Sequence, residues 1–430
     1  MATQLSRNFG EQGNQRKFTI SVWVKRSKLG AAQSIMGSGG SSAYATHMYF
    51  DNNDRIDFWN YFNSAYQGRK ITNRKFRDTN AWYHIVMAVD TTSSQSTAAD
   101  RMKIYVNGVR ETSFSTSSNP NQDQTFEIGH NGTHYIGGYG TGANFEGYMS
   151  HFHYCDGYQY QASDFGETDS TTGEWKIKTT PNVQYGTTGH FILKDGNSVT
   201  DQSGLTHNWT VANGTLTKTE DNPSHIFATL NPLVYESRDN TFSNGNNTIT
   251  GGGSDSWTNK YGTSTIAPNS GKYYVEAKLI TKVSSQAILG LISTSKALSG
   301  SLKDIGVFAL ETEGRLTGSG NNIQTGLTAF SNGDIAGLAF DATNGTAQFY
   351  RNGSTYGNAL SSIPSDTYYI ATTTYPSGGV INFNFGNGYF GTTAVATNSG
   401  NGYQDADGNG IFNYSVPTNY RCFSTKGVNQ

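Results

Sequence analysis

Apolar residues alternate with a period of two along the segment 17–25, a pattern that fits an extended strand and not a helix. The face expected to be buried carries four apolar side chains: Phe18, Ile20, Val22 and Val24. Thr19, Ser21 and Trp23 fall on the opposite face. Trp23 and Trp82 are nevertheless expected to be buried. Other segments with strand character are 49–50, 55–61, 82–90, 101–106, 124–128, 146–154, 190–193, 335–341 and 347–351.

The composition agrees with an all-β chain. Charged residues make up 14% of the sequence, well below the roughly 25% of an average soluble domain. Their place is taken by small polar residues, by 51 Gly and by 26 Tyr and 23 Phe. Thr and aromatic residues suit a pleated, half-buried surface, whereas Gly and Asn suit tight turns. Few segments have the Ala, Leu, Glu and Lys content that favours a helix.

A length of 430 residues fits two sandwich domains of roughly 200 residues each. A similar pattern occurs in each half: a strand that ends in Asp (Asp90, Asp341), followed by a strand that ends in Asn-Gly (107–108, 352–353). Asn-Gly favours positive φ at both central positions of a hairpin turn. The prolines of the segment 222–232 predict an ordered junction there. We therefore predict two tandem antiparallel β-sandwiches, residues 1–222 and 223–430.

Charge and cysteine content exclude several classes of protein. The net charge is −2 and no basic run exceeds two residues, so a nucleic-acid partner is not expected. Cys155 and Cys422 lie in different predicted domains and are expected to be free thiols. Neither a signal peptide nor a stretch of 18 apolar residues is present, so membrane insertion is not expected. A polar β-protein that looks extracellular but has no secretion signal is typical of a virus particle, and we expect a virion location.

Specific segments resemble known families. Residues 17–155 resemble a laminin-G/concanavalin-A-like sandwich of jelly-roll type, in FTISVWVKRS (18–27), AWYHIVMAVD (81–90), MKIYVNGV (102–109) and FEGYMSHFHYCDG (145–157). The second half resembles a SPRY-type sandwich, in SGKYYVEAKL (270–279), AILGLIS (287–293), DIAGLAFDATNGTAQFYRNGS (334–354) and VINFNFGNGYF (380–390).

The tandem order is similar to that of marine bacteriophage virion structural proteins, in which segments like 164–178, 221–233 and 410–424 recur. This resemblance implies a particle-surface protein (a fibre, a spike, or a capsid or tail decoration) that mediates attachment to other virion proteins and adhesion to a host surface or glycan. The habits of virion fibres imply a homotrimer. A secreted carbohydrate-binding adhesin is the alternative, followed by a sandwich-fold glycoside hydrolase.

Hydrolysis of a glycoside requires two suitably spaced carboxylates. The paired acids Glu167/Asp169 and Glu311/Glu313 come nearest, but each pair lies beside a Gly-rich or Ser/Thr-rich turn and lacks a third acid at the expected spacing. We therefore predict that the chain is not an enzyme and name no catalytic residue.

No cofactor or metal is predicted, although calcium remains open. The segment 405–410 resembles the beginning of an EF-hand loop, but Val416 stands where the bidentate Glu would be. A turn explains this segment better. Four residues in the first half have suitable oxygen atoms for a rim site: Asp51, Asn53, Asp54 and Asp100. His151 and His153 alternate on one strand, which predicts a polar row that faces solvent or a partner, or less readily a transition-metal site.

Aromatic residues interleaved with Asn and Asp indicate glycan binding, because sugars stack on rings and pair their hydroxyls with polar groups. Asp57, Trp59, Asn60 and Tyr61 form the first candidate cluster, with Trp59 and Tyr61 on one face and Asn60 opposite. Trp257 and Tyr261 form the second, in a segment expected to be an exposed loop. The alternative is a structural role, in which these rings pack in the cores or between subunits.

Overall fold

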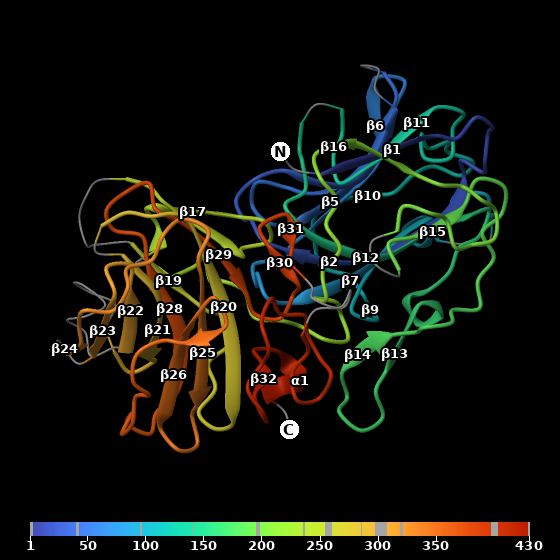
Figure 1. Ribbon diagram of the computed structural model, residues 1–430. Helices are drawn as coiled ribbons and strands as arrows, with labels where there is room; N and C mark the ends of the chain where they lie inside the picture. The colour runs from blue at the N-terminus through green and yellow to red at the C-terminus, as the bar shows by residue number, and fades with distance from the viewer. Residues whose placement is uncertain are drawn as a thin grey trace. The chain divides into compact units, whose positions relative to one another are not determined.

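The computed structural model describes residues 3–39, 43–94, 97–140, 142–194, 198–234, 237–253, 260–284, 286–296, 308–318, 321–396 and 403–428. The chain forms two compact units, Met1–Lys218 and Thr219–Gln430 (Figure 1). Each unit is a β-sandwich, and nearly all of its strand pairs are antiparallel. The predicted all-β fold is confirmed. Among the described residues, no helix is long and apolar enough to cross a membrane.

The first unit is built on two sheets. The larger sheet has the strand order β10-β6-β5-β4-β3-β11-β1-β16. In chain order its strands are β1 (Gln4–Asn8), β3 (Gln33–Gly39), β4 (Ala45–Phe50), β5 (Ile56–Phe62), β6 (Ala65–Thr72), β10 (Phe114–Ser118), β11 (Thr133–Ile136) and β16 (Thr210–Asn213). The smaller sheet has the order β15-β12-β2-β7-β8-β9. Its strands are β2 (Lys17–Arg26), β7 (Trp82–Asp90), β8 (Met102–Val106), β9 (Val109–Arg110), β12 (Gly147–Asp156) and β15 (His190–Ile192). A separate hairpin and two short 3-10 helices complete the unit: β13 (Gly166–Thr168), β14 (Trp175–Ile177), η1 (Ala98–Asp100) and η2 (Ala162–Asp164).

The core of the first unit lies between the two sheets. The predicted inward face of β2 is confirmed, because Phe18, Ile20, Val22 and Val24 all belong to this core. Met48 and Phe58 reach it from the opposite sheet. Trp23 and Trp82 are buried as predicted, and the ring of Trp23 stacks on His84 on the outer side of β2 and β7. Both faces of this sheet are therefore covered.

The second unit repeats this two-sheet plan. One sheet has the order β17-β18-β29-β20-β25-β26-β27, and β32 pairs with β20 in parallel. Its strands are β17 (Asn240–Ser243), β18 (Thr248–Gly251), β20 (Lys272–Thr281), β25 (Ile335–Asp341), β26 (Thr346–Arg351), β27 (Ser354–Thr355), β29 (Val380–Asn384) and β32 (Arg421–Cys422). The other sheet has the order β19-β28-β21-β22-β23-β24. Its strands are β19 (Tyr261–Thr263), β21 (Ala287–Ser293), β22 (Phe308–Glu311), β23 (Arg315–Gly318), β24 (Asn321–Gln324) and β28 (Tyr368–Thr373). The hairpin of β30 (Tyr389–Phe390) and β31 (Thr393–Ala394) and the helix α1 (Thr425–Val428) are also present.

The central strands of the two units are paired in the same way, with a Lys facing an Asp in each unit. Lys17 faces Asp90 across β2 and β7, and their side chains form an ion pair at 3.0 Å. Lys272 faces Asp341 across β20 and β25 in the same way, at 3.2 Å. The pattern of Asp-ended and Asn-Gly-ended strands thus corresponds to the same three-strand arrangement in both units.

The two Asn-Gly turns are also alike. Asn107 and Gly108 have φ of 46° and 82°, and Asn352 and Gly353 have 51° and 82°, so the prediction of positive φ at both turn positions is confirmed. The ring of Trp175 covers Gly108, where a Cβ atom would lie 2.6 Å from the indole. The ring of Tyr414 covers Gly353 equally closely. Only glycine permits these contacts, because any side chain would displace the ring.

Each unit also contains one buried cysteine on the outer side of its central sheet. Cys155 packs with Val86, Phe165 and the segment that contains Trp175. Cys422 packs with Tyr274 and Phe412. Both thiols are free, as predicted.

One predicted strand is wrong. Residues 124–128 do not form a strand, although Phe126 and Ile128 are buried in the core. The backbone N–H of Phe126 donates to Gln15 O, and Gln124 N–H closes a turn on Asn121 O. The alternation of this segment therefore reflects side chains that fill the core from a loop.

Candidate functional site

The candidate site lies on the outer face of the larger sheet of the first unit, over β4, β5 and β6. Trp59 and Tyr61 lie on this face, as their spacing predicts, and both are half-buried. Asn60 points into the unit and is fully buried. Its Oδ1 accepts from Thr46 Oγ1 at 2.7 Å, and its Nδ2 donates to Thr125 O at 2.8 Å. Asn60 therefore supports the strand from behind and does not reach the outer face.

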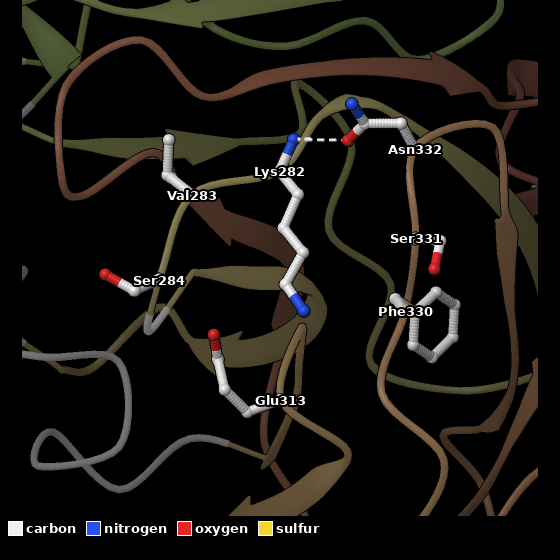
Figure 2. Close-up of a pocket in the computed structure, with 7 residues that line it drawn as sticks. All are labelled: Lys282, Val283, Ser284, Glu313, Phe330, Ser331 and Asn332. Carbon is white, nitrogen blue, oxygen red and sulfur yellow. Dashed lines mark hydrogen bonds between the residues drawn. The ribbon is translucent and has the colours of Figure 1, made fainter.

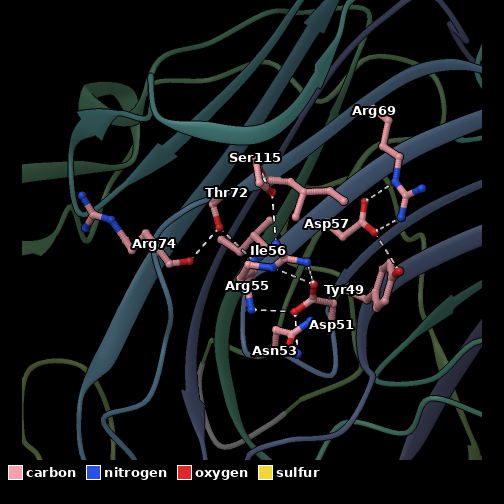
Figure 3. A network of polar contacts seen from close by, with 11 residues as sticks. Tyr49, Asp51, Asn53, Arg55, Ile56, Asp57, Arg69, Thr72, Arg74 and Ser115 are labelled. Atoms are coloured by element: carbon pink, nitrogen blue, oxygen red, sulfur yellow. Dashed lines mark hydrogen bonds and ion pairs between the residues drawn. The ribbon is translucent and has the colours of Figure 1, made fainter.

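Asp57 is bound by two neighbours on the same face (Figure 3). Arg69 donates to it twice, at 2.6 Å and 3.1 Å, and Tyr49 Oη donates at 2.8 Å. The hydrogen bonds with Asp57 raise the pKa of Arg69. Burial, and then the charge of Asp57, raise the pKa of Tyr49. The carboxylate is 1% exposed, so its charge is compensated within the protein.

Three aromatic side chains gather on this face at the end of β5 and the beginning of β6. This aromatic patch consists of Trp59, Tyr61 and Tyr66. Trp59 meets Tyr61 and Tyr66 edge to face, with centroids 6.5 Å and 5.9 Å apart. Tyr44 and Phe62 form a separate edge-to-face pair, with centroids 4.9 Å apart. Tyr66 is 50% exposed, and the guanidinium of Arg69 lies 4.7 Å from its ring centroid.

Three parallel rings continue the aromatic patch toward β3. His47 stacks on Tyr49 at 4.5 Å and on Tyr139 at 4.6 Å. His47 Nε2 and Ser34 Oγ share a hydrogen bond of 2.9 Å. Burial lowers the pKa of His47 to about 3, so the imidazole is neutral near pH 7. Trp59 contacts His47 edge-on at 5.6 Å, which joins the ring stack to the aromatic patch.

Sequence analysis found Trp59 and Tyr61 but missed Tyr66 and Arg69. These two residues come from the neighbouring strand, and their position depends on a register shift in the β5–β6 pairing next to Tyr61. The available signal was the Asn63-Ser64 turn, which joins the aromatic-rich strand β5 to the strand that contains Tyr66. Both turn residues have positive φ, at 51° and 60°.

The second predicted glycan cluster does not lie on a described surface. Trp257 lies outside the described residues. Tyr261 lies in β19, where its ring is fully buried against Ala287, Ile292 and Ala371. Its ring therefore offers no face for a ligand to stack on.

The second unit has an open cleft of about 660 Å³ between three loops (Figure 2). The cleft is lined by Lys282, Val283, Ser284, Glu313, Phe330, Ser331 and Asn332. Asn332 Oδ1 accepts from the backbone N–H of Lys282 at 2.7 Å, and Phe330 N–H donates to Thr312 O at 2.8 Å. These bonds fix the walls. The lining mixes one cation, one anion and two hydroxyls, which matches no single ligand chemistry.

Three of the four candidate calcium ligands, the aspartates, are bound to arginines. Asp51 pairs with Arg55 at 2.7 Å, and Asp100 pairs with Arg110 at 2.8 Å. Asp54 is held by two arginines, one of them the buried Arg26. A cation at these carboxylates would have to displace a guanidinium, so the donor set does not fit calcium. Within the described ranges, no three His, Cys, Asp or Glu side chains are grouped to hold a metal ion.

Two other candidate metal segments have structural roles. Asp405 Oδ1 accepts from the backbone N–H groups of Asp407 and Asn409, which closes a turn as predicted. The expectation that His151 and His153 form an outward polar row is wrong. His153 lies on the outer face, opposite Ser21, but it is buried there because Phe165, Tyr185 and Phe191 cover it. The strand is also irregular at His151, where φ is 50°. A ladder with a bulge does not keep the period of two.

The paired acids also have partners. Lys176 contacts Glu167 and Asp169 at 3.6 Å and 3.0 Å. Arg315 forms an ion pair with Glu311 at 2.5 Å. A catalytic pair needs one carboxyl group whose pKa is held high enough to donate a proton. The pKa of Asp169 is instead lowered, by hydrogen bonds from the backbone N–H of Thr172, from Lys176 and from the backbone N–H of Thr171.

Comparison with known proteins gives one family match, in the first unit, and several similar solved structures. A family model of the concanavalin A-like lectin/glucanases superfamily matches residues 4–157. No curated protein matches this chain. Three solved structures illustrate the similarity. The SPRY domain of human HERC1 is 16% identical, with 36% of this chain and 96% of that chain covered and a TM-score of 0.29. The native heptameric SAP-like pentraxin from Limulus polyphemus is 18% identical, with 45% and 87% covered and a TM-score of 0.31. Domain 4 of AbnA, a GH43 extracellular arabinanase from Geobacillus stearothermophilus in complex with arabinotriose, is 20% identical, with 34% and 64% covered and a TM-score of 0.27.

The class of protein is therefore defined by its architecture. The chain is all-β and consists of two antiparallel sandwiches in tandem, and the first of them contains the segment 4–157 that matches the concanavalin A-like lectin/glucanases superfamily model.

Proposed function

We propose that this chain is a non-enzymatic adhesion protein whose first unit binds carbohydrate through the aromatic patch. The observation that carries the proposal is the half-exposed ring of Tyr66, held beside Trp59 and Tyr61 on an open sheet face. Sugar rings present C–H faces that pack on aromatic rings, and the surrounding polar groups orient the hydroxyls. The match of the first unit to the lectin/glucanase superfamily supports the proposal.

Polar groups suited to sugar hydroxyls surround the aromatic patch. Tyr44 Oη donates to Asn63 Oδ1 at 2.7 Å, which leaves the Asn63 amide nitrogen directed away from that bond. Tyr61 Oη donates to Ser64 O at 2.7 Å. The second bond fixes the ring of Tyr61 before a ligand arrives, and a fixed site costs less conformational entropy on binding.

Removing the most exposed ring tests the proposal. A glycan array with the full chain identifies the ligand, and titration of that ligand against Tyr66→Ala measures the role of the ring. We expect at least a tenfold loss of affinity. Tyr158→Ala is the matched control, because Tyr158 is 39% exposed and lies on another part of the same unit. Binding that survives Tyr66→Ala unchanged contradicts the use of the aromatic patch.

We further propose that the protein lies on the surface of a virus particle, as a fibre, spike or decoration, and assembles as a homotrimer with other virion proteins. The similarity of segments 164–178, 221–233 and 410–424 to marine bacteriophage structural proteins supports this location. Immunogold labelling of purified particles with an antibody to this chain tests it. Unlabelled particles would leave a secreted carbohydrate-binding adhesin as the better assignment. Mass photometry tests the trimer, which a stable monomer at micromolar concentration would contradict.

The absence of enzymatic activity is part of the proposal. Lys176 and Arg315 beside the paired acids support it. Incubation of the full chain with the glycan that it binds, followed by chromatography of the products, is expected to return the intact glycan. Shortened products would instead favour a glycoside hydrolase.

A further inference from the structure

The outer face of the larger sheet in the first unit carries very little charge. Within their described strands, β3, β4, β10, β11 and β16 contain no Lys, Arg, Asp or Glu at all. Asp57 is the charged residue of β5, and Arg69 and Lys70 are those of β6. For a chain with 62 charged residues of these four types (30 basic plus 32 acidic), this is a wide uncharged surface.

Two of the basic residues in this sheet do not belong to the outer face. Lys70 stands opposite Phe58, which is in the core. It is 3% exposed and its Nζ donates to Ser117 Oγ and Asn119 Oδ1. Arg7 of β1 stands opposite the buried His134. Neither side chain therefore adds charge to the aromatic patch.

The remaining charges of the outer face neutralise each other. Arg69 stands opposite Trp59 and lies beside the aromatic patch. Its Nε and Nη2 atoms both donate hydrogen bonds to Asp57. The turn between β4 and β5 adds Asp51 and Arg55, which pair at 2.7 Å. His47 in the ring stack is neutral near pH 7. A ligand carboxylate placed here would lose its hydration without gaining a free cation, which is unfavourable.

Resting on the proposed carbohydrate-binding function, we infer that the ligand of the aromatic patch is an uncharged saccharide. Chains that carry uronate or sialate carboxylates are excluded. In this arrangement Arg69 is a positioning residue, because its guanidinium lies over the ring of Tyr66 while Asp57 takes its hydrogen bonds. Binding by stacking and by neutral hydrogen bonds has little ionic component, so the affinity is nearly independent of salt.

A glycan array that carries neutral chains together with uronate-bearing and sialate-bearing chains tests the inference on the full protein. Each hit is then titrated at 20 mM and 500 mM NaCl. We expect neutral hits whose Kd changes less than twofold between the two salt concentrations. Hits confined to charged chains, with affinity that falls steeply with salt, overturn the inference but leave the proposed function standing. Folded protein that binds no chain of either kind overturns the proposed function itself.

The double variant D57N/R69Q separates the two roles that Arg69 can have. It removes both charges at once, so no unpaired charge is left in the sheet and folding is less disturbed than by either single change. We expect it to keep the preference for neutral chains, with a Kd within about tenfold of the wild type. Circular dichroism checks that it folds. If the wild type binds a charged chain and the double variant does not, Arg69 recognises the carboxylate and the inference is wrong.

Discussion

The ring of Tyr139 lies directly on Gly37, so close that a Cβ atom on residue 37 would come within 2.3 Å of Tyr139 Cδ2. Tyr139 belongs to a loop far along the chain from β3, and it reaches His47 only because Gly37 has no side chain. The ring stack beside the aromatic patch therefore depends on one glycine in the middle of a strand.

Gly37→Ala is expected to push Tyr139 away from His47. Such overpacking costs about 1–3 kcal/mol of folding free energy, and glycan affinity should fall because the ring stack beside Trp59 is disturbed. Chemical denaturation and glycan titration measure the two effects. Gly142→Ala is the control, because a Cβ atom there meets nothing within 4 Å. Equal stability of both variants would contradict the contact.

The buried ion pair of Arg26 and Asp54 provides a second test. Arg26 Nη2 lies 3.1 Å from Asp54 Oδ1, and neither side chain is more than 3% exposed. Removing one partner leaves a buried charge uncompensated, so Asp54→Asn is expected to lower the free energy of unfolding by about 3–5 kcal/mol. Asn tolerates the positive φ of 64° at this position, so the change acts on the charge and not on the backbone.

Asp123→Asn is the matched control for that substitution. Asp123 also has positive φ, at 60°, and it pairs with Arg16. Both side chains are at least half exposed, so this pair contributes less than about 1 kcal/mol. Urea titration of the two variants should therefore separate them clearly. Similar midpoints would mean that the buried pair is no more important than the exposed one.

Local sequence patterns predicted those features that depend on neighbouring residues. The alternation around Trp59 fixes which side chains share a face, and the Asn-Gly turns fix the sign of φ. Contacts that depend on distant segments were not predictable in this way. Tyr139 reaches the site from a loop, and Tyr66 is placed by a shift in strand register. Tyr261 has the same local pattern as Trp59 but lies in a buried strand, because burial depends on what the rest of the chain covers.

Buried histidines should make the first unit sensitive to acid. Trp175 Nε1–H donates to His84 Nδ1 at 3.0 Å, a bond that a protonated imidazole cannot accept. Burial lowers the pKa of three histidines from 6.5 to about 3: His47, His84 and His190. Because the unfolded chain binds these protons first, the stability that they contribute is complete above pH 6.5 and is lost as the pH falls. At pH 5 the loss is about 2 kcal/mol for each histidine, or roughly 6 kcal/mol together.

A loss of that size is comparable with the whole stability of a typical domain. Cys155 is buried in this unit and measures its opening directly. We expect labelling of Cys155 by 4,4′-dithiodipyridine, which reacts in acid, to accelerate sharply between pH 6.5 and 5. The labelling rate of the unfolded chain in denaturant, measured at each pH, corrects for the pH dependence of the reagent itself. A rate that stays flat down to pH 4 would show that these histidines are protonated in the folded unit.

Glu276 should make the stability of the second unit depend on pH in the opposite direction. This carboxyl group is fully buried and accepts from the backbone N–H groups of Asn413 and Tyr414 at 2.8 Å and 2.9 Å. Burial raises its pKa from 4.5 to about 7, against the effect of these bonds. Between those values the folded unit binds more protons than the unfolded chain, so stability falls as the pH rises from 4.5 to 7. The drop amounts to roughly 3 kcal/mol.

His225 acts in the other direction in the same unit, because burial lowers its pKa to about 4. The contribution of Glu276 is therefore measured as the difference in stability between the wild type and Glu276→Gln. The variant has no ionisable group at position 276 but keeps His225. Labelling of Cys422, the buried cysteine of this unit, follows its opening. We expect the wild type to lose its stability advantage over Glu276→Gln as the pH rises toward 7. A difference that grows with pH would mean that the hydrogen bonds from Asn413 and Tyr414 outweigh burial and hold the pKa of Glu276 below 4.5.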